Sequence, residues 1–384
     1  MEIKKLCDEV FDHVVELRRS IHEEPEIGMD VEKTAAKVKV ELDHLGISYR
    51  ETEHHGIIAD IKGEKGESDK MVMIRADMDA LPVEEKTGLP YCSKIEGKMH
   101  ACGHDLHTSM LVGSAIVLNQ LKSEFSGTVR LLFQPAEEIA IGAKELIKEG
   151  AMDGVSMGFG IHMEPLKPVG TISIANGADW ASCDRFEIKV KGESAHGATP
   201  QKGKDAIVCA SDIVMSLQTI VSREVNPMYP LVITVGCMHG GSAFNVVCDE
   251  VTLLGTCRSF DKDAYELIPE AIERVANNIA KAHRCEVEVN IERLSKPLVN
   301  NPDAYKMMHA SAVKVFGEEG VLEAQKEMIA EDFAEYGELA PCCFAHLGAD
   351  GEYPLHNGHI NFKEESMKYG MALEVQTALD YLNQ

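Results

Sequence analysis

The sequence lacks the features by which nucleic-acid-binding, membrane and disulfide-stabilised proteins are usually recognised. Acidic residues outnumber basic ones by 63 to 38, and the formal net charge is −25, which argues against nucleic acid or an anionic membrane surface as a partner. The chain begins without a signal-peptide pattern, and it contains no run of about 18 apolar residues. Its 11 cysteines are odd in number and irregularly spaced, which favours a reducing compartment over a disulfide framework. We therefore expect a cytoplasmic protein.

The length of the chain predicts more than one domain. At 384 residues it is too long for a single compact core, so two or three domains are expected. The pattern of apolar residues changes near Ala181 and changes back near Pro297. We predict that residues 1–180 and 295–384 form one domain, into which residues 181–294 are inserted as a second.

In the first domain, helical patterns alternate with short apolar runs. Helices are predicted over residues 2–24, 30–45, 107–122, 142–150, 302–315 and 364–382. Apolar runs bounded by turn residues predict strands over residues 57–61, 71–76, 128–133, 157–161 and 344–347. This alternation is typical of an α/β sheet that is covered by helices on both faces.

The inserted segment has a different order of elements. Strands are predicted over residues 184–191, 231–237, 246–255 and 286–291, and helices over residues 205–221 and 264–282. The order strand-helix-strand-strand-helix-strand indicates a small α+β domain with a four-stranded antiparallel sheet. We expect this domain to act as a lid.

A stretch rich in histidine, Met99–His107, directly precedes an apolar helical segment. Within it, Cys102 and His104 are separated by one glycine, so a turn can aim both side chains at the same cation. A thiolate and an imidazole together suit zinc or another borderline-soft metal. Any further ligands must come from elsewhere in the chain.

Polar side chains stand at the ends of three predicted strands of the first domain. In chain order they are Asp77 with Asp79, Glu137 with Glu138, and His162. Open α/β sheets place their functional sites at the carboxyl ends of strands. Each side chain taken alone has a structural explanation, as a turn cap, as the start of a solvated helix or as a core histidine. Their joint placement favours a single site.

Several ordered motifs resemble a metal-dependent amidohydrolase family. They are Leu17-Arg18-Arg19, Ile21-His22, Pro25-Glu26, Arg75-Ala76-Asp77-Met78-Asp79-Ala80-Leu81-Pro82, Ala101-Cys102-Gly103-His104-Asp105, Gln134-Pro135-Ala136-Glu137-Glu138, Gly160-Ile161-His162, Gly240-Gly241-Ser242-Ala243-Phe244-Asn245-Val246-Val247, Gly255-Thr256-Cys257-Arg258, Glu331-Asp332-Phe333 and Pro354-Leu355-His356-Asn357. The family is the aminoacylase and hippurate-hydrolase branch of the dinuclear metallopeptidases, which is similar also to plant auxin-conjugate hydrolases and bacterial N-acetyl-diaminopimelate deacetylases. The resemblance covers essentially the whole chain. It implies a two-domain metallopeptidase-like fold, with a mixed sheet in the catalytic α/β domain.

The resemblance implies two divalent cations per subunit and a hydrolytic mechanism. The implied ligands are Cys102, His104, Glu138, His162 and His356. The Cys102 thiolate would bridge the two cations, which can be zinc, manganese, nickel or cobalt. Glu137 is implied to be the general base, which takes a proton from water held between the cations and returns it to the leaving amine. The resulting hydroxide would attack the amide carbonyl of an N-acyl amino acid.

The same resemblance implies roles for residues outside the ligand set. Asp77 would orient a metal-binding imidazole, and His196, in a loop of the lid, would stabilise the developing oxyanion. Asn245 and Arg258 match positions that bind the carboxylate of the amino-acid portion, although Arg258 could instead pair with a surface acid. Family members commonly form homodimers through the lid and supply the lid histidine to the partner's site, so we expect a homodimer.

Alternatives remain open at two ligand positions. His107 is a second histidine close to Cys102 and could bind a metal, or it could pack and hydrogen-bond at the start of a helix. His359 rivals His356, although the motif Pro354–Asn357 favours His356.

Alternatives to the function also remain. The nearest is a dipeptidase or carboxypeptidase that uses the same site. A hydrolase with Cys102 as nucleophile and His104 as base is a different class of enzyme. A non-catalytic metal-binding scaffold is a third possibility, but the presence of Glu137 beside a complete ligand set argues against it. The sequence does not determine which acyl group is removed.

Overall fold

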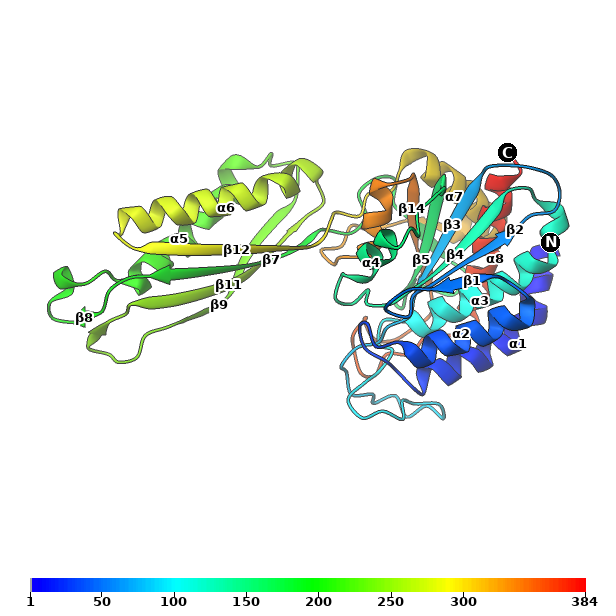
Figure 1. The fold of residues 1–384 in the computed structure, drawn as a ribbon, viewed down its shortest axis with the longest axis horizontal. Coiled ribbons are helices and arrows are strands. Elements are labelled where there is room, and N and C mark those ends of the chain that lie inside the picture. The colour runs from blue at the N-terminus through cyan, green and yellow to red at the C-terminus, as the bar shows by residue number, and fades with distance from the viewer. Residues whose placement is uncertain (1) are drawn as a thin grey trace. The chain divides into compact units, whose positions relative to one another are not determined.

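The computed structural model describes residues 2–384, which form two compact units (Figure 1). The first unit comprises the residues up to Gly177 together with Val299–Gln325 and Asp332–Gln384. The second comprises Ala178–Leu298 and Lys326–Glu331. The short return segment Lys326–Glu331 belongs to the second unit, whereas the sequence pattern assigned it to the first. Its backbone explains why, because Ala181 N–H donates to the carbonyl oxygens of Glu327 and Ile329.

An eight-stranded mixed sheet forms the centre of the first unit, with strand order β1-β2-β4-β3-β5-β14-β6-β13. Its strands are β1 (Tyr49–Glu51), β2 (Ile57–Lys62), β3 (Met71–Asp77), β4 (Thr128–Gln134), β5 (Met157–Glu164), β6 (Ile172–Ile174), β13 (Val321–Glu323) and β14 (Cys342–Gly348). The central strands β4, β3, β5 and β14 are mutually parallel. Strand β2 runs antiparallel to β1 and β4, and β6 runs antiparallel to β14 but parallel to β13. The predicted mixed sheet is therefore confirmed. Its parallel strands bring the residues that follow β3, β4 and β5 to one edge.

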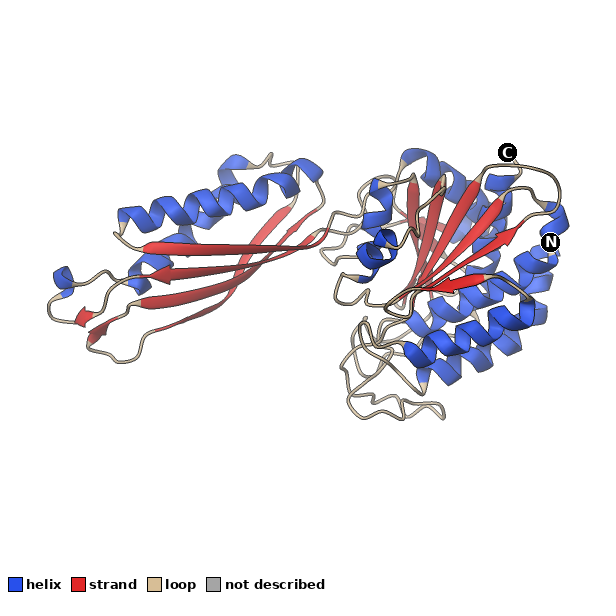
Figure 2. Ribbon diagram, viewed as in Figure 1, coloured by secondary structure: helices blue, strands red, loops and turns tan. Residues whose placement is uncertain are grey.

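Six helices of the first unit surround this sheet (Figure 2). They are α1 (Glu2–His22), α2 (Glu32–Leu45), α3 (His104–Gln120), α4 (Gly142–Lys148), α7 (Pro302–Phe316) and α8 (Ser366–Leu382), and the 3-10 turns η1 (Lys122–Glu124), η4 (Glu318–Gly320) and η5 (Asp332–Glu338) lie between them. Helix α3 packs against α1, α8 and β3. It begins at His104, three residues earlier than the predicted segment 107–122, because Gly103 in a left-handed conformation (φ 92°) starts the helix.

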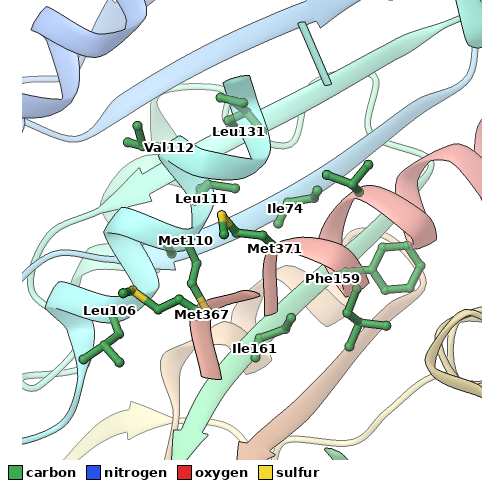
Figure 3. Packing of buried hydrophobic residues seen from close by; sticks show 14 of the residues in the cluster. Ile74, Leu106, Met110, Leu111, Val112, Leu131, Phe159, Ile161, Met367 and Met371 are labelled. Atoms are coloured by element: carbon green, nitrogen blue, oxygen red, sulfur yellow. The ribbon is translucent and has the colours of Figure 1, made fainter. Parts of the chain in front are cut away.

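Methionines of α3 and α8 pack against each other's helix, and Figure 3 shows Met110 and Met371 in this contact. Met110 of α3 lies over Gly370 of α8, and Met371 of α8 lies over Gly113 of α3. A Cβ atom at either glycine would collide with the sulfur of the facing methionine. The two backbones can therefore approach closely, and flexible thioethers fill the remaining space above the sheet. This contact fixes the body of α3, whose first turn carries His104.

A four-stranded antiparallel sheet with order β12-β7-β11-β9 forms the second unit, as predicted. Its elements are β7 (Cys183–Lys191), β8 (Ala195–His196), η2 (Pro200–Lys202), α5 (Ala206–Thr219), the π-turn η3 (Ile220–Glu224), β9 (Leu231–Gly240), β10 (Val246–Val247), β11 (Glu250–Ser259), α6 (Lys262–Ala282) and β12 (Glu286–Ser295). The prediction of a single strand over residues 246–255 was wrong. The chain changes partner there, since β10 pairs with β8 and β11 pairs with β7 and β9.

One helical stretch of the described residues, Ala206–Glu224, is long and apolar enough to cross a membrane by length and composition alone. This is weak evidence, because helices that pack in a protein core pass the same test. Ala210, Ile213 and Leu217 of this stretch are buried in the core of the second unit.

Candidate metal centre

The turn Cys102-Gly103-His104 presents two candidate ligands from the start of α3. Gly103 has φ 92°, and a Cβ atom placed on it would lie 3.0 Å from Cγ of Met163. Both the backbone conformation and the lack of space therefore require glycine between the two side chains. The Cys102 Sγ atom lies 3.4 Å from His162 Nε2, so this turn meets the strand β5 at its carboxyl-terminal part.

The orientation of His162 suits metal binding. Its Nδ1–H group donates a hydrogen bond of 2.8 Å to the carbonyl oxygen of Met163. This bond fixes the tautomer and turns Nε2 toward Cys102. Burial lowers the pKa of His162 well below its ordinary value, so the imidazole is neutral, as a metal ligand must be.

Two groups of candidate ligands share the Cys102 sulfur. Cys102, His104 and His162 form one group, and Cys102, Glu138 and His356 form the other, with the ligand atoms of each group within 4.8 Å of one another. His356 Nε2 is 3.5 Å from Glu138 Oε2. Cys102 is thus the one residue common to both groups, and the family resemblance implies the bridging position for it.

His356 reaches this group through an unusual backbone conformation. Its φ angle is 64°, which is uncommon for a residue other than glycine. Its N–H group donates a hydrogen bond of 2.9 Å to the carbonyl oxygen of Ala101. Both His356 and its rival His359 are exposed. The ring centroid of His359 lies 5.4 Å from that of Tyr353, and His359 belongs to none of the candidate ligand groups found among residues 2–384.

The polar atoms of this region fit divalent cations. Both ring nitrogens of His104 and the Oε1 atom of Glu138 are buried, and none has a hydrogen-bond partner in the part of the chain that the structure describes. Buried polar atoms of this kind are costly unless something satisfies them. Burial alone would lower the pKa of His104, but Asp77, Asp79 and Glu138 raise it to about 10. The field at this point therefore favours positive charge, and the sulfur, nitrogen and oxygen donors suit a transition metal.

Asp79 holds the loop that carries Glu137 and Glu138. Its two carboxylate oxygens accept the backbone N–H groups of Glu137 at 3.0 Å and of Glu138 at 3.2 Å. The loop is tightly turned, since Ala136 and Ala140 both have positive φ angles. The sequence placed Asp79 at the end of a strand but assigned it no role. Its position two residues after Asp77 was the available signal, because both side chains leave the strand at the site.

His107 lies beside the candidate ligands, but both of its ring nitrogens are engaged. Nδ1–H donates a hydrogen bond of 2.6 Å to Asp77 Oδ1, and Nε2 accepts the N–H group of Met163 at 2.9 Å. Asp77, His104 and His107 also converge within 4.8 Å, yet His107 has no lone pair left for a metal. It connects Asp77 to the backbone of β5.

Asp77 is buried among positive and hydrogen-bonding groups. Burial would raise its pKa, but His104, His107 and Arg75 hold it well below the ordinary value. The guanidinium of Arg75 donates to Asp77 Oδ2 at 2.6 Å. Asp77 Oδ2 also lies 3.7 Å from His104 Nε2. The carboxylate is therefore charged and lies close to the imidazole of His104.

The remaining predicted residues belong to the second unit. His196 is exposed in β8, and its Nδ1 atom accepts the N–H group of Ala198 at 3.0 Å. This assigns the proton to the exposed Nε2, which can act as a donor. Gly197 N–H donates to the carbonyl oxygen of Asn245 at 2.7 Å, so His196 and Asn245 lie in one cluster of loops.

Arg258 lies in β11 and is half-buried. Its guanidinium donates to Thr256 Oγ1 and to the carbonyl oxygen of Cys257. Among residues 2–384 it forms no ion pair with a carboxylate, so its charge is not neutralised by a surface acid of the chain.

Comparison with known proteins gives matches along nearly the whole chain. The model of peptidase family M20/M25/M40 matches residues 73–380. An N-acetylcysteine deacetylase of Bacillus subtilis (strain 168) is 37% identical over 365 residues, which cover 94% of this chain and 95% of the relative. A hippurate hydrolase of Campylobacter jejuni is 36% identical over 370 residues, which cover 95% and 96%. A solved structure described as a dinuclear metal-binding peptidase of the M20 family, from Bacillus subtilis, is similar with a TM-score of 0.87 and 34% identity, covering 98% of this chain and 99% of that chain.

Proposed function

Because the chain belongs to peptidase family M20/M25/M40 and is a hydrolase of amide bonds, we propose that it is a dinuclear metal-dependent amidohydrolase that removes the acyl group from N-acyl amino acids. The observation that carries this proposal is the pair of ligand groups that share Cys102, with Glu137 beside them. Two relatives are named for this kind of substrate, N-acetylcysteine and hippurate. These two substrates differ in the acyl group, so the acyl group is varied in the substrate panel below.

The proposed ligands are Cys102, His104, Glu138, His162 and His356. The orphaned nitrogens of His104 and the buried Oε1 of Glu138 support this set. Divalent cations held here would lower the pKa of a water molecule and polarise the amide carbonyl. Asp77 is proposed to orient His104, because its charged carboxylate lies 3.7 Å from His104 Nε2.

Glu137 is the proposed general base. Its Oε2 atom is 4.0 Å from His104 Nε2, and its backbone is fixed by Asp79. A carboxylate oxygen in this position accepts a proton from the attacking water and then delivers it to the nitrogen of the leaving amine. Glu138 is adjacent in the chain but turns toward Cys102 and His356, so the two neighbouring carboxylates take different tasks.

Three residues of the second unit are proposed to act on the substrate. His196 presents its Nε2–H group to solvent and is suited to donate a hydrogen bond to the oxyanion of the tetrahedral intermediate. Asn245 and Arg258 are proposed to bind the carboxylate of the amino-acid portion. The absence of a carboxylate partner for Arg258 among the described residues supports this role, because the guanidinium keeps its charge for a ligand.

A homodimer through the second unit is proposed as well. Strand β9 stands at the edge of the four-stranded sheet and is largely exposed. On the neighbouring helix α5, Ile207, Val208 and Met215 are also exposed. An unpaired edge strand beside an apolar helix face is a surface that proteins usually cover. A second copy of the chain is the proposed partner.

The decisive experiment compares Glu137→Gln with Glu138→Gln in protein reconstituted with zinc or manganese. E137Q should keep two metals per subunit, measured by elemental analysis, and lose turnover of N-acyl amino acids by about a hundredfold or more. E138Q should lose metal as well as activity. Full turnover by a two-metal E137Q protein would refute the assignment, and a panel of N-acyl amino acids and dipeptides would separate a deacylase from a dipeptidase.

A further inference from the structure

Behind the candidate metal centre lies a group of buried polar residues that the proposed mechanism does not use. We call it the Asp105 cluster, and it consists of Arg18, His22 and Asp105. All three are at most 2% exposed. Arg18 and His22 come from the last two turns of α1, whereas Asp105 directly follows His104 in the first turn of α3.

Both α1 residues contact the same carboxylate oxygen. Arg18 Nε lies 2.7 Å from Asp105 Oδ2, and His22 Nδ1 lies 2.7 Å from the same atom. Ions buried this deeply are costly unless they are paired and hydrogen-bonded. A capping role does not account for Asp105, because Gly103, the residue at the start of α3, has no side-chain cap and Asp105 turns toward α1.

The α1 side of the cluster is itself anchored. The guanidinium of Arg18 lies 3.3 Å from Glu364, and Arg19 binds the same carboxylate through two hydrogen bonds. Both guanidinium groups stack against the ring of Tyr91, at 4.9 and 4.8 Å from its centroid. The end of α1 is therefore a fixed support from which Arg18 and His22 reach α3.

The turn between the two ligands needs such a support. Gly103 connects Cys102 to His104, and glycine restricts its own backbone less than any other residue. The direction of His104 relative to Cys102 is therefore set by what the first turn of α3 contacts. Neighbouring residues of a helix project about 100° apart, so fixing Asp105 on one side fixes the rotation of His104 on another.

We propose that Asp105 is a positioning residue, which Arg18 and His22 hold so that His104 keeps its metal-binding direction relative to Cys102. This proposal rests on the ligand set given under the proposed function. It adds that the buried contact between α1 and α3 controls the geometry and affinity of the metal centre, without touching metal or substrate.

The test uses cobalt(II) in place of the native metals, because cobalt bound to a thiolate and imidazoles absorbs visible and near-ultraviolet light according to its geometry. His22→Leu removes the donor to Asp105, whereas His22→Asn keeps an N–H donor near the position of Nδ1. We expect H22L to alter the cobalt spectrum and to weaken metal binding about tenfold or more. We expect H22N to stay close to the wild-type protein in both measurements. H22L should also lower kcat with little change in KM.

Glu364→Gln is the matched control, because it removes the charge of the carboxylate that Arg18 and Arg19 contact but keeps an oxygen that accepts their hydrogen bonds. E364Q should lower thermal stability but leave the cobalt spectrum and the metal affinity unchanged. Asp105→Asn is a stronger perturbation, and if it does not fold, the pair H22L and H22N decides the question.

Two results overturn the proposal. The first is a wild-type cobalt spectrum and metal affinity in H22L, and the second is an equal change in H22L and H22N. Failure of the proposed function looks different, because the wild-type protein would then bind no cobalt through a thiolate at all.

Discussion

Glu374 should make the stability of the first unit depend on pH. This residue lies in α8 and is 4% exposed, and Ser114 Oγ donates a hydrogen bond of 2.5 Å to its carboxyl group. Burial raises the pKa of Glu374 from 4.5 to about 8, and the Ser114 hydrogen bond opposes this only in part. A group whose pKa is raised by folding stabilises the protein fully below its unfolded pKa, and that stabilisation is lost as the pH rises through the folded value.

The size of this effect follows from the two pKa values. At about 1.4 kcal/mol per pKa unit, linkage gives a loss of about 4 kcal/mol in the free energy of unfolding between about pH 5 and about pH 9. Glu374→Gln cannot ionise and keeps an oxygen that accepts the Ser114 hydrogen bond. The variant should therefore lack this part of the pH dependence and be the more stable protein at alkaline pH.

Urea unfolding followed by far-ultraviolet circular dichroism measures this difference. Fluorescence is unsuitable, because the single tryptophan, Trp180, lies in the other unit. Comparing wild type and E374Q at both pH values cancels the contribution of the titrating groups that do not interact with Glu374. Glu319→Gln, at an exposed position, is the matched control and should follow the wild-type protein. Equal pH dependence of E374Q and wild type would refute the reasoning.

Three further results are expected. Arg258→Met should raise KM for N-acyl amino acids at least tenfold, with metal content unchanged by elemental analysis, because only the carboxylate contact is lost; an unchanged KM would assign Arg258 a structural role. Gly113→Ala should lower the free energy of unfolding by about 1–3 kcal/mol, because its Cβ collides with Met371; Gly66→Ala, where nothing lies within 4 Å of the added Cβ and φ is not positive, is the control in thermal denaturation and should follow the wild-type protein. Chelation should abolish activity, and added zinc, manganese, nickel or cobalt should restore it. Thiol alkylation should prevent this restoration only when the protein is alkylated in its metal-free form. Alkylation that inactivates the metal-loaded protein equally would favour a Cys102 nucleophile.

Local patterns predicted the framework of the site. Strand-end carboxylates and the Cys-Gly-His turn are recognisable in sequence, because parallel strands deliver their last residues to one edge. The choice between His104 and His107 was not predictable in this way. The two histidines stand three residues apart on one helix, so helical spacing treats them alike. Their partners decide, since Asp77 and the Met163 N–H group occupy both nitrogens of His107.

Long-range partnerships limited the prediction elsewhere. His22 was noted only as part of a motif near the end of a predicted helix, and nothing near it in the sequence indicates Asp105, 83 residues away. The predicted strand over residues 246–255 failed for a related reason. The apolar residues Val246 to Cys248 and Val251 to Leu254 were read as one strand across Asp249 and Glu250, but the chain changes its hydrogen-bonding partner there, from β8 to β7. The spacing of apolar residues indicates which face of a strand is buried, but it does not indicate which other strand pairs with it.

The hydrogen bond from the N–H group of His356 to the carbonyl oxygen of Ala101 has a consequence for synthesis on the ribosome. Cys102, His104, Glu138 and His162 all emerge before the inserted unit is made, whereas His356 follows it. Helix α8, which packs against α3, also follows the inserted unit. A nascent chain that ends within the inserted unit therefore lacks both His356 and the helix that fixes α3. The proposed ligand group of Cys102, Glu138 and His356 can be completed only after the stretch of about 200 residues between His162 and His356 has been translated, which takes roughly 10–40 s at 5–20 residues per second.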